Sequence, residues 1–372
     1  MRFSYQLPAA LIGVAASIVL VQPQVAVALS PDEVGRIAKS ITVRIESSKQ
    51  GSGVIIKQQG NTYTVLTAAH VVERAGQYAI VTPDDSRYPL NYSTVKKLSG
   101  VDLAVVQFTS SKSYSVAKIG NSDSVTEGKA AYVAGFPVAT AAINRSIYQF
   151  TDGKITANAS QPLRDGYALV YSNNTLPGMS GGPVLNENGE VIGVHGRADT
   201  TTATSDVNPE IAYLKTNFNL GIPINTFLRL SLPVGVDVGV RAPSPRASTT
   251  PKADDFFIQG VDRYQKGDYQ GAVAALNKAI ELNPNYVEAY NNRGATHYQM
   301  GDRRGAIEDY SQALRVNPNF AAAYNNRGYI RNQLGDKRGA LADLQRAADL
   351  FQQQGNTELY QRALNEIRRL QQ

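Results

Sequence analysis

The sequence predicts two domains of different fold class, an all-β domain followed by an all-α solenoid. Short segments rich in Val, Ile, Thr and Tyr, separated by Gly, Asn, Asp and Pro, run from about residue 41 to residue 222, which is the pattern of antiparallel sandwiches and barrels. A stretch rich in Pro, Ser and Thr follows, and beyond it the chain repeats with a period of 34 residues, as helical repeat proteins do. The length of 372 residues suits two domains.

The composition excludes several functional classes. The chain has no cysteine, which excludes disulfides and thiolate metal sites. The formal net charge is +6, and the charges are interspersed, without the basic run and interleaved aromatic residues that nucleic-acid binding needs. We therefore expect no nucleic-acid partner, no metal and no cofactor.

Residues 1–28 have the pattern of a secretory signal. Arg2 provides the positive start, an apolar run extends from Leu7 to Val21, and Ala26-Val27-Ala28 forms a cleavage site of small residues. The alternative is an uncleaved membrane anchor, but the apolar centre is short for a span, and prolines interrupt both flanks. We expect export to the periplasm or the extracellular space, with no integral membrane segment after the signal is removed.

The segment after the signal predicts a short helix and then a series of strands. The helix is expected at residues 31–40, and a second helix at residues 225–230 closes the domain, which spans residues 29–233. Expected strands are residues 41–45, 53–57, 62–67, 78–82, 103–108, 130–134, 146–155, 168–172, 184–185, 190–195 and 218–222.

Residues 234–253 are expected to be a linker. They contain Pro243, Pro245 and Pro251 among serines and threonines, a composition that favours extended chain and does not build a core. We expect limited proteolysis to cut here first and to release two folded pieces.

The last part of the chain has a clear internal repeat. Gly260, Gly294 and Gly328 are separated by 294 − 260 = 328 − 294 = 34 residues, and several alanines keep the same step. A period of 34 with small residues where two helices cross is the tetratricopeptide signature. We expect three such repeats over residues 254–352, with residues 353–372 as the solvating cap that stacked repeats require.

Ser180 lies in a glycine-rich motif, Leu176-Pro177-Gly178-Met179-Ser180-Gly181-Gly182-Pro183. A serine that attacks carbonyl groups needs a base, and it needs backbone N–H groups directed at the oxygen that becomes negative. The flanking glycines allow a tight turn in which the N–H groups of Gly178 and Ser180 point to one spot, forming an oxyanion hole. The alternative is a glycine-rich hairpin loop with an incidental serine.

Two further segments favour the catalytic interpretation. Thr67-Ala68-Ala69-His70 ends an apolar strand, and Asp102 precedes another, so that the order is His70, Asp102, Ser180. This order is that of the chymotrypsin arrangement. Here the sequence resembles the trypsin-like (chymotrypsin-fold) serine peptidases, with bacterial glutamyl endopeptidases and HtrA-like peptidases the most similar, over roughly residues 30 to 230.

The resemblance implies two six-stranded barrels with the site in the cleft between them. It implies that His70 is the general base, that Asp102 orients the imidazole, and that Ser180 forms an acyl-enzyme. His70 could instead be a core histidine and Asp102 a strand cap. Asp84 and Asp85 compete with Asp102 by distance along the chain, but they lie in a turn-like segment.

Thr175 and His195 lie at the offsets from Ser180 at which glutamyl endopeptidases place the residues of the primary specificity pocket (S1). The resemblance implies that they receive an acidic side chain, with Gly196 beside them. A hydroxyl and a charged imidazole can both donate to a carboxylate. The alternative is a pocket for small apolar side chains, walled by His195. Asn174 replaces the Asp that gives trypsin its basic preference, which disfavours cleavage after Arg or Lys.

The sequence therefore predicts an exported serine endopeptidase that cleaves polypeptides and has a C-terminal tetratricopeptide module that recruits a protein partner or substrate. The alternative is a non-catalytic binding scaffold built on a peptidase fold. Asn292, Arg293, Asn326 and Arg327 recur before the repeat glycines, where they could grip a peptide in the groove or be solvated surface.

Overall fold

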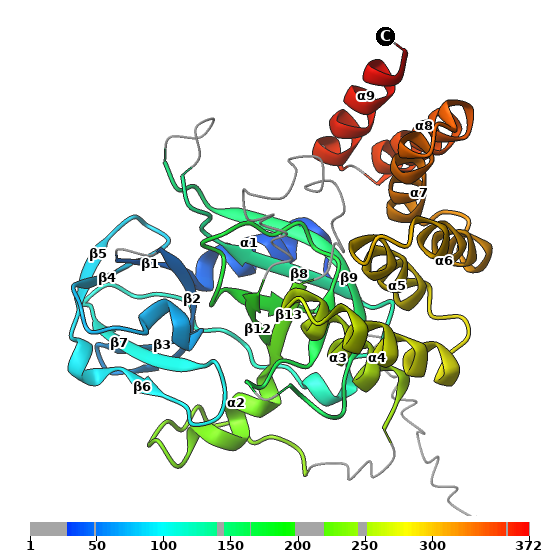
Figure 1. The fold of residues 1–372 in the computed structure, drawn as a ribbon. Coiled ribbons are helices and arrows are strands. Elements are labelled where there is room, and N and C mark those ends of the chain that lie inside the picture. The colour runs from blue at the N-terminus through cyan, green and yellow to red at the C-terminus, as the bar shows by residue number, and fades with distance from the viewer. Residues whose placement is uncertain are drawn as a thin grey trace, which may run out of the picture.

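The computed structural model describes residues 28–47, 50–139, 145–163, 165–197, 219–244, 251–354 and 356–371. Residues 1–27, which hold almost all of the expected signal, lie outside the described residues. Within the described ranges, none of the helices has the length and apolar character that a bilayer span requires. Figure 1 shows a β-rich part beside a row of helices that extends away from it.

Helix α1 (Pro31–Ile41) opens the β-rich part and is fixed at its start by a capping box. The Ser30 side chain accepts from the Glu33 N–H, while the Glu33 side chain accepts from the Ser30 N–H. Its buried face is formed by Val34, Ala38 and Ile41. This face packs against strands β8 (Ala130–Gly135) and β9 (Gln149–Asn158) (Figure 1). The helix thereby joins the first sheet to the second.

The first seven strands form one antiparallel sheet in the order β5-β4-β1-β2-β3-β7-β6. Ile45, Ile55 and Tyr63 are completely buried in its core. Its strands are β1 (Thr42–Glu46), β2 (Gly51–Gln59), β3 (Thr62–Thr67), β4 (Tyr78–Val81), β5 (Arg87–Leu90), β6 (Lys96–Lys97) and β7 (Ala104–Thr109).

This sheet differs from the six-stranded barrel that was expected for the first half. The sequence pattern missed the two edge strands, β5 and β6. Strand β5 contains Pro89, which is tolerated at a sheet edge but weakens a strand prediction, and β6 is two exposed lysines long. Strand β5 alternates over only four positions, and β6 has no apolar residue, so neither pattern is long enough to predict a strand.

The second half closes into a six-stranded barrel in the order β10-β13-β12-β11-β8-β9. Leu169, Val184 and Ile192 are buried inside it. Its strands are β8 (Ala130–Gly135), β9 (Gln149–Asn158), β10 (Leu169–Tyr171), β11 (Pro183–Leu185), β12 (Val191–Arg197) and β13 (Asn219–Pro223). Helix α2 (Ile224–Ser231) follows β13 directly and buries Phe227 and Leu228.

The chain after α2 stays attached to the β-rich part. Val236 is 6 % exposed within the core that contains Phe227, and the Lys96 ammonium donates to the Val234 carbonyl at 2.8 Å. Residues 245–250 of the expected linker lie outside the described residues. The expected linker over residues 234–253 is thus packed at its start, because its valines are apolar enough to join the core.

The helical part consists of paired antiparallel helices. Each first helix of a pair is followed by a glycine with positive φ, Gly267 (77°), Gly301 (83°) and Gly335 (85°), and then by an aspartate that caps the second helix. The helices are α3 (Ala253–Gln265), α4 (Tyr269–Leu282), α5 (Val287–Gln299), α6 (Arg303–Val316), α7 (Ala321–Gln333), α8 (Lys337–Gln353) and α9 (Thr357–Gln371).

Helix α3 packs directly on the closed barrel, beside β9 (Figure 1). Phe257, Ile258 and Val261 are at most 1 % exposed and belong to the same hydrophobic cluster as barrel residues such as Val170 and Leu220. The first helical pair and the barrel therefore share one core. This arrangement differs from the two independent pieces expected from the sequence.

Two aspartates at the start of α3 add polar contacts to that core. Asp255 is completely buried and accepts from the Ser160 hydroxyl and the Gln161 N–H, both at 2.8 Å. Asp254 accepts from the Asn158 N–H at 2.8 Å and from the Tyr286 hydroxyl at 3.0 Å. Each of these contacts except the Tyr286 bond crosses between the barrel and the repeats.

Candidate active site

His70 and Asp102 are brought together by the pairing of β3 with β7. Thr67, the last residue of β3, lies opposite Ala104, the first residue of β7. His70 follows β3 on a short 3₁₀ helix (Ala69–Val72), and Asp102 lies two residues before β7. The register of two adjacent strands therefore positions two residues that are 32 positions apart.

The two side chains form a direct pair. His70 Nδ1 lies 2.7 Å from Asp102 Oδ2, and the His70 backbone N–H donates to Asp102 Oδ1 at 2.9 Å. The imidazole is 45 % exposed and the carboxylate 18 %. Burial of Asp102 opposes its ionisation, but hydrogen bonds from His70 and Tyr167 outweigh burial, and the pKa of Asp102 lies below its ordinary value.

Tyr167 is a third member of this cluster, and no sequence motif indicates it. Its hydroxyl donates to Asp102 Oδ2 at 2.5 Å, and the residue is completely buried. Burial, with Asp102 beside it, raises the pKa of Tyr167 far above its ordinary value, so that the phenol stays a donor. Tyr167 precedes β10 without any motif, and only its place in the fold reveals the contact.

The glycine-rich motif forms a tight turn before β11. Gly178 has φ +97° and Gly181 has φ +88°, a backbone region in which glycine is favoured. The Val138 N–H donates to the Pro177 carbonyl at 2.8 Å, which fixes the peptide between Pro177 and Gly178. Because the two groups of a planar peptide point in opposite directions, the Gly178 N–H faces away from Val138.

Ser52 on β2 anchors the same turn from the first sheet. Its N–H donates to the Ser180 carbonyl at 2.8 Å, and its hydroxyl donates to the Gly178 carbonyl at 2.9 Å. The Phe136 N–H donates to that hydroxyl at 2.8 Å. Ser52 is completely buried, so that the two halves of the β-rich part are hydrogen-bonded at the motif.

The Ser180 hydroxyl donates to the Gly196 carbonyl at 2.9 Å. Within the described residues, no hydrogen bond joins Ser180 to His70. Gly196 lines the same cavity as His70 and Asp102, so the Ser180 hydroxyl is bonded to a residue of that cavity.

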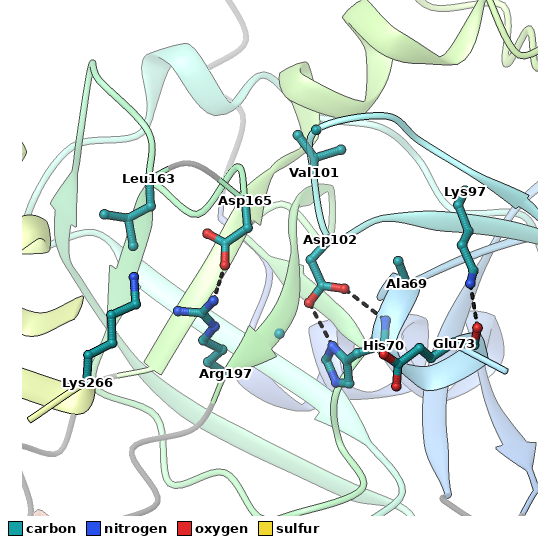
Figure 2. A pocket seen from close by; sticks show the side chains of 12 residues that line it. Ala69, His70, Glu73, Lys97, Val101, Asp102, Leu163, Asp165, Arg197 and Lys266 are labelled. Atoms are coloured by element: carbon teal, nitrogen blue, oxygen red, sulfur yellow. Dashed lines mark hydrogen bonds and ion pairs between the residues drawn. The ribbon is translucent and has the colours of Figure 1, made fainter. Parts of the chain in front are cut away.

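That cavity has a volume of about 840 Å³ and lies between the two halves of the β-rich part and the first repeat (Figure 2). Figure 2 shows Asp102 bonded to His70, with Arg197 bonded to Asp165 nearby and Lys266 at the far wall. Lys266 follows helix α3, so a residue of the repeats contributes to this cavity. The cavity is lined by Ala69, His70, Glu73, Lys97, Gly100, Val101, Asp102, Leu163, Asp165, Gly196, Arg197 and Lys266.

The two side chains expected in the S1 pocket have separate partners. The Thr175 hydroxyl donates to the Asn219 side-chain oxygen. His195 is completely buried on β12, and its Nδ1 lies 2.7 Å from the Tyr171 hydroxyl. Among the described residues, none forms a hydrogen bond with its buried Nε2. No hydrogen bond among the described residues joins Thr175 to His195.

The environment of His195 favours the neutral imidazole. Burial, together with repulsion from His70, lowers its pKa from 6.5 to about 3. The charged imidazole that the sequence resemblance implied is therefore not the form present in the free protein at neutral pH.

The recurring polar residues of the repeats have partners within the repeat stack. Arg293 donates to Asp309 at 2.5 Å, and Arg327 donates to Asp343 at 2.8 Å, each pair joining the two helices of one repeat. Asn292 and Asn326 are 2 % exposed. Asn292 donates to the Glu288 carbonyl of its own helix, and Asn326 donates to Asn291 of the preceding repeat. The two asparagines are therefore buried and are not a solvated surface.

Among the described residues, no group of three or more His, Asp or Glu side chains could hold a metal ion.

Family models match both parts of the chain. Residues 51–194 match the model of the trypsin-like peptidase domain. Residues 260–301 match a TPR repeat model, and residues 287–320 and 321–354 match tetratricopeptide repeat models. The expected fold class, a chymotrypsin-like β domain followed by helical tetratricopeptide repeats, is confirmed.

Curated relatives resemble the first part of the chain. Serine protease Do-like HtrA of Lactococcus lactis subsp. lactis is 28 % identical over 177 residues, which are 46 % of this chain and 43 % of that protein. Putative serine protease HhoA of Synechocystis sp. is 34 % identical over 155 residues, which are 41 % of this chain and 38 % of that protein. The chain thus spans less than half the length of these relatives.

Among solved structures, the chain is similar to the HtrA-type protease AlgW with a tripeptide. The match has 20 % sequence identity and a TM-score of 0.44, and covers 55 % of this chain and 63 % of that one.

Proposed function

Since residues 51–194 are a trypsin-like peptidase domain and residues 260–354 are tetratricopeptide repeats, we propose that this protein is a serine endopeptidase that hydrolyses polypeptides through an acyl-enzyme. The pair formed by His70 and Asp102, 2.7 Å apart, carries the proposal. Ser180 lies in a glycine-rich turn, and its hydroxyl donates to Gly196, which lines the same cavity as this pair.

In the proposed mechanism, His70 removes the proton of the Ser180 hydroxyl as the oxygen attacks the substrate carbonyl. Asp102 accepts from His70 Nδ1, which leaves Nε2 free to receive that proton, and the carboxylate stabilises the imidazolium that forms. The imidazolium then donates the proton to the leaving amine. Water hydrolyses the acyl-enzyme by the same route. The Ser180 hydroxyl must first leave the Gly196 carbonyl, which a rotation about a single side-chain bond achieves.

The Gly178 and Ser180 N–H groups are the proposed oxyanion hole. The bond from the Val138 N–H to the Pro177 carbonyl supports this role, because it holds the Gly178 N–H on the opposite side of the peptide. The bond from the Ser52 hydroxyl to the Gly178 carbonyl fixes the next peptide. Such donors stabilise a tetrahedral intermediate most when they are fixed before the reaction.

The substrate side chain that precedes the scissile bond is proposed to be acidic. Support comes from His195, whose buried Nε2 has no hydrogen-bond partner among the described residues. When the Tyr171 hydroxyl donates to Nδ1, the neutral ring carries its proton on Nε2 and can donate it to a carboxylate. A neutral, buried imidazole also suits a pocket for small apolar side chains, which is the rival specificity.

Export and partner recruitment are also proposed. The pattern of residues 1–28 supports a secretory signal, and relatives such as the Chlamydia trachomatis protein described as a probable periplasmic serine endoprotease DegP-like support the periplasm as the compartment. Tetratricopeptide repeats form extended concave surfaces, which supports recruitment of a protein partner or substrate by residues 254–352.

A fluorophosphonate probe tests the catalytic proposal directly. The unmodified protein is expected to become labelled at Ser180, and Ser180→Ala or His70→Ala should lower peptide hydrolysis by about 10⁴-fold or more. Ser113→Ala, which removes an exposed hydroxyl of the first half, is the matched control and should label normally. Hydrolysis that persists in Ser180→Ala would instead favour the non-catalytic scaffold, with a contaminant as the source of activity.

A mixed peptide library tests the specificity. Glu, and less so Asp, should be preferred before the scissile bond. His195→Phe should reduce cleavage after Glu by about 10- to 100-fold, because phenylalanine has no N–H group to donate to the buried carboxylate, while cleavage after small apolar residues changes little. A library profile dominated by Ala, Val or Leu in the unmodified protein would decide for the rival pocket.

A further inference from the structure

A continuous series of contacts runs from the first repeat to the catalytic aspartate. Asp262, on helix α3, accepts from Arg197 Nη1 at 3.2 Å. The Arg197 guanidinium lies over the Tyr167 ring, 4.6 Å from its centroid. The Tyr167 hydroxyl donates to Asp102 Oδ2 at 2.5 Å. Three side chains therefore connect a tetratricopeptide helix to the partner of His70.

Arg197 has a fixed position at the end of β12. Asp165 accepts from its Nη2, and Asp262 accepts from Nη1, so one carboxylate holds each side of the guanidinium. The Asp165 carbonyl in turn accepts from the Asp102 N–H at 2.9 Å. Arg197 directly follows Gly196, the residue that accepts from the Ser180 hydroxyl.

Gly196 has no side chain at the point where Tyr167 needs space. A Cβ atom built on Gly196 would lie 2.1 Å from the Tyr167 hydroxyl oxygen. Any other residue at this position would push the phenol away from Asp102. The absence of a side chain at Gly196 therefore allows the Tyr167 hydroxyl to reach Asp102.

Asp262 also departs from the pattern of the repeats. One period later the same helical position is Thr296, and two periods later it is Ile330 (262 + 34 = 296; 296 + 34 = 330). Both are completely buried in the repeat stack. The first repeat has no preceding repeat to pack on, and the barrel occupies that place, where Asp262 meets Arg197.

We propose that Tyr167, Arg197 and Asp262 are positioning residues for Asp102, so that the first tetratricopeptide repeat is part of the peptidase active site. The inference rests on the proposed function. Tyr167 holds Asp102 through its hydroxyl, Arg197 holds the Tyr167 ring in place, and Asp262 fixes Arg197 on the side opposite Asp165. None of the three touches the scissile bond.

Tyr167→Phe tests the last contact, because it keeps the ring beneath Arg197 and removes only the hydroxyl. The rate of acylation should fall by about 10- to 100-fold, as expected for a lost hydrogen bond to a charged group. The Asp102 charge is then no longer shared with the phenol and favours the imidazolium of His70 more strongly. The acidic limb of the pH–rate profile should therefore move to higher pH. Tyr88→Phe, in the first sheet, is the control.

Asp262→Asn tests the contact from the repeat. It keeps the shape of the side chain and removes its charge, and kcat should fall by about 3- to 10-fold with KM for a short peptide unchanged. Asp262→Glu keeps the charge and should restore part of the rate. Glu281→Gln, which removes an exposed carboxylate paired with Lys278 on α4, is the control and should leave kcat unchanged.

The decisive measurement is a double-mutant cycle with full-length protein. If Asp262 acts through Tyr167, the effect of Asp262→Asn should disappear in the Tyr167→Phe background. A merely structural role would lower the rate equally in both backgrounds and would leave the pH–rate profile of Tyr167→Phe unchanged, and either result would overturn the inference.

Two controls separate this inference from the proposed function. Absence of Ser180-dependent labelling in the unmodified protein would overturn the proposed function, and this inference with it. Normal labelling with additive effects of the two substitutions would overturn only the inference. NMR of the His70 ring C–H groups provides a readout that does not depend on turnover, and their chemical shifts should change in Tyr167→Phe.

Discussion

The first and third repeats have the same 34-residue plan but different neighbours. At three equivalent positions the first repeat has Asp254, Asp255 and Asp262, whereas the third has Ala322, Ala323 and Ile330. The aspartates bond to the barrel and to Arg197. The alanines and isoleucine are at most 9 % exposed and pack in the repeat stack.

This difference shows that a repeat module and its neighbour cannot be separated by sequence period alone. The third repeat packs on helices and buries apolar side chains at its contact face. The first repeat packs on the ends of barrel strands, where backbone N–H groups such as those of Asn158 and Gln161 need acceptors. Carboxylates provide those acceptors, so the first repeat belongs structurally to the peptidase part.

Matched core substitutions should have the largest effect on this comparison. Phe257→Ala leaves a cavity between the barrel and α3 and should lower the free energy of unfolding by about 3–5 kcal/mol, and Ile330→Ala should cost about 2–5 kcal/mol. Hydrogen exchange distinguishes the two sites, because Phe257→Ala should speed exchange in β9, whereas Ile330→Ala should speed it only in the later repeats. Protection of β9 that is equal in both variants would contradict a shared core.

Asp255→Ala should have a smaller effect. It gives the first repeat the residue that the second and third have at this position, and it leaves the Ser160 hydroxyl and Gln161 N–H without their acceptor. The expected loss of stability is about 1–3 kcal/mol, with faster amide exchange at Gln161. Ala323→Ser, in the third repeat, provides a comparison that touches no barrel residue. Unchanged exchange at Gln161 would contradict the contact.

The smallest predicted effect concerns pH. Partial desolvation, and the neighbouring Asp254 carboxylate, raise the pKa of Glu127 from 4.5 to about 7. Glu127 remains exposed, so solvent screening keeps the effect on stability small. Between these values the unfolded chain has lost the Glu127 proton while the folded protein retains it, so stability should fall as the pH rises from about 4.5 to 7. Glu127→Gln should flatten this part of a plot of Tm against pH and raise Tm at pH 8. An unchanged slope would contradict the carboxyl pair.

Sequence reasoning predicted the fold class because the signals are local and periodic. The 34-residue step of Gly260, Gly294 and Gly328 and the strand patterns between residues 41 and 222 needed no tertiary information. The motifs at His70, Asp102 and Ser180 were sufficient to nominate a site. The structure pairs His70 with Asp102 and bonds the Ser180 hydroxyl to Gly196, which lines the same cavity as that pair.

The contacts missed by the sequence depend on neighbours that are distant along the chain. Tyr167 reaches Asp102 across 65 positions, and Arg197 reaches Asp262 across 65 positions, and neither pair has a local pattern. Burial of His195 likewise depends on Tyr171 and the closed barrel, so its neutral state could not be inferred. One sequence feature did indicate a contact: Asp262 is charged, whereas the equivalent positions of the later repeats hold Thr296 and Ile330.

Two shortened chains test most directly whether the first repeat belongs to the peptidase part. A chain that ends at Asn319 keeps the first two repeats, and a chain that ends at Arg246 has none. We expect the longer chain to become labelled at Ser180 at the rate of the full-length protein. Labelling of the shorter chain should be slower by about 10-fold or more, because the barrel loses its partners Phe257, Asp255 and Asp262. Equal labelling rates in the two shortened chains would contradict the assignment of the first repeat to the peptidase part.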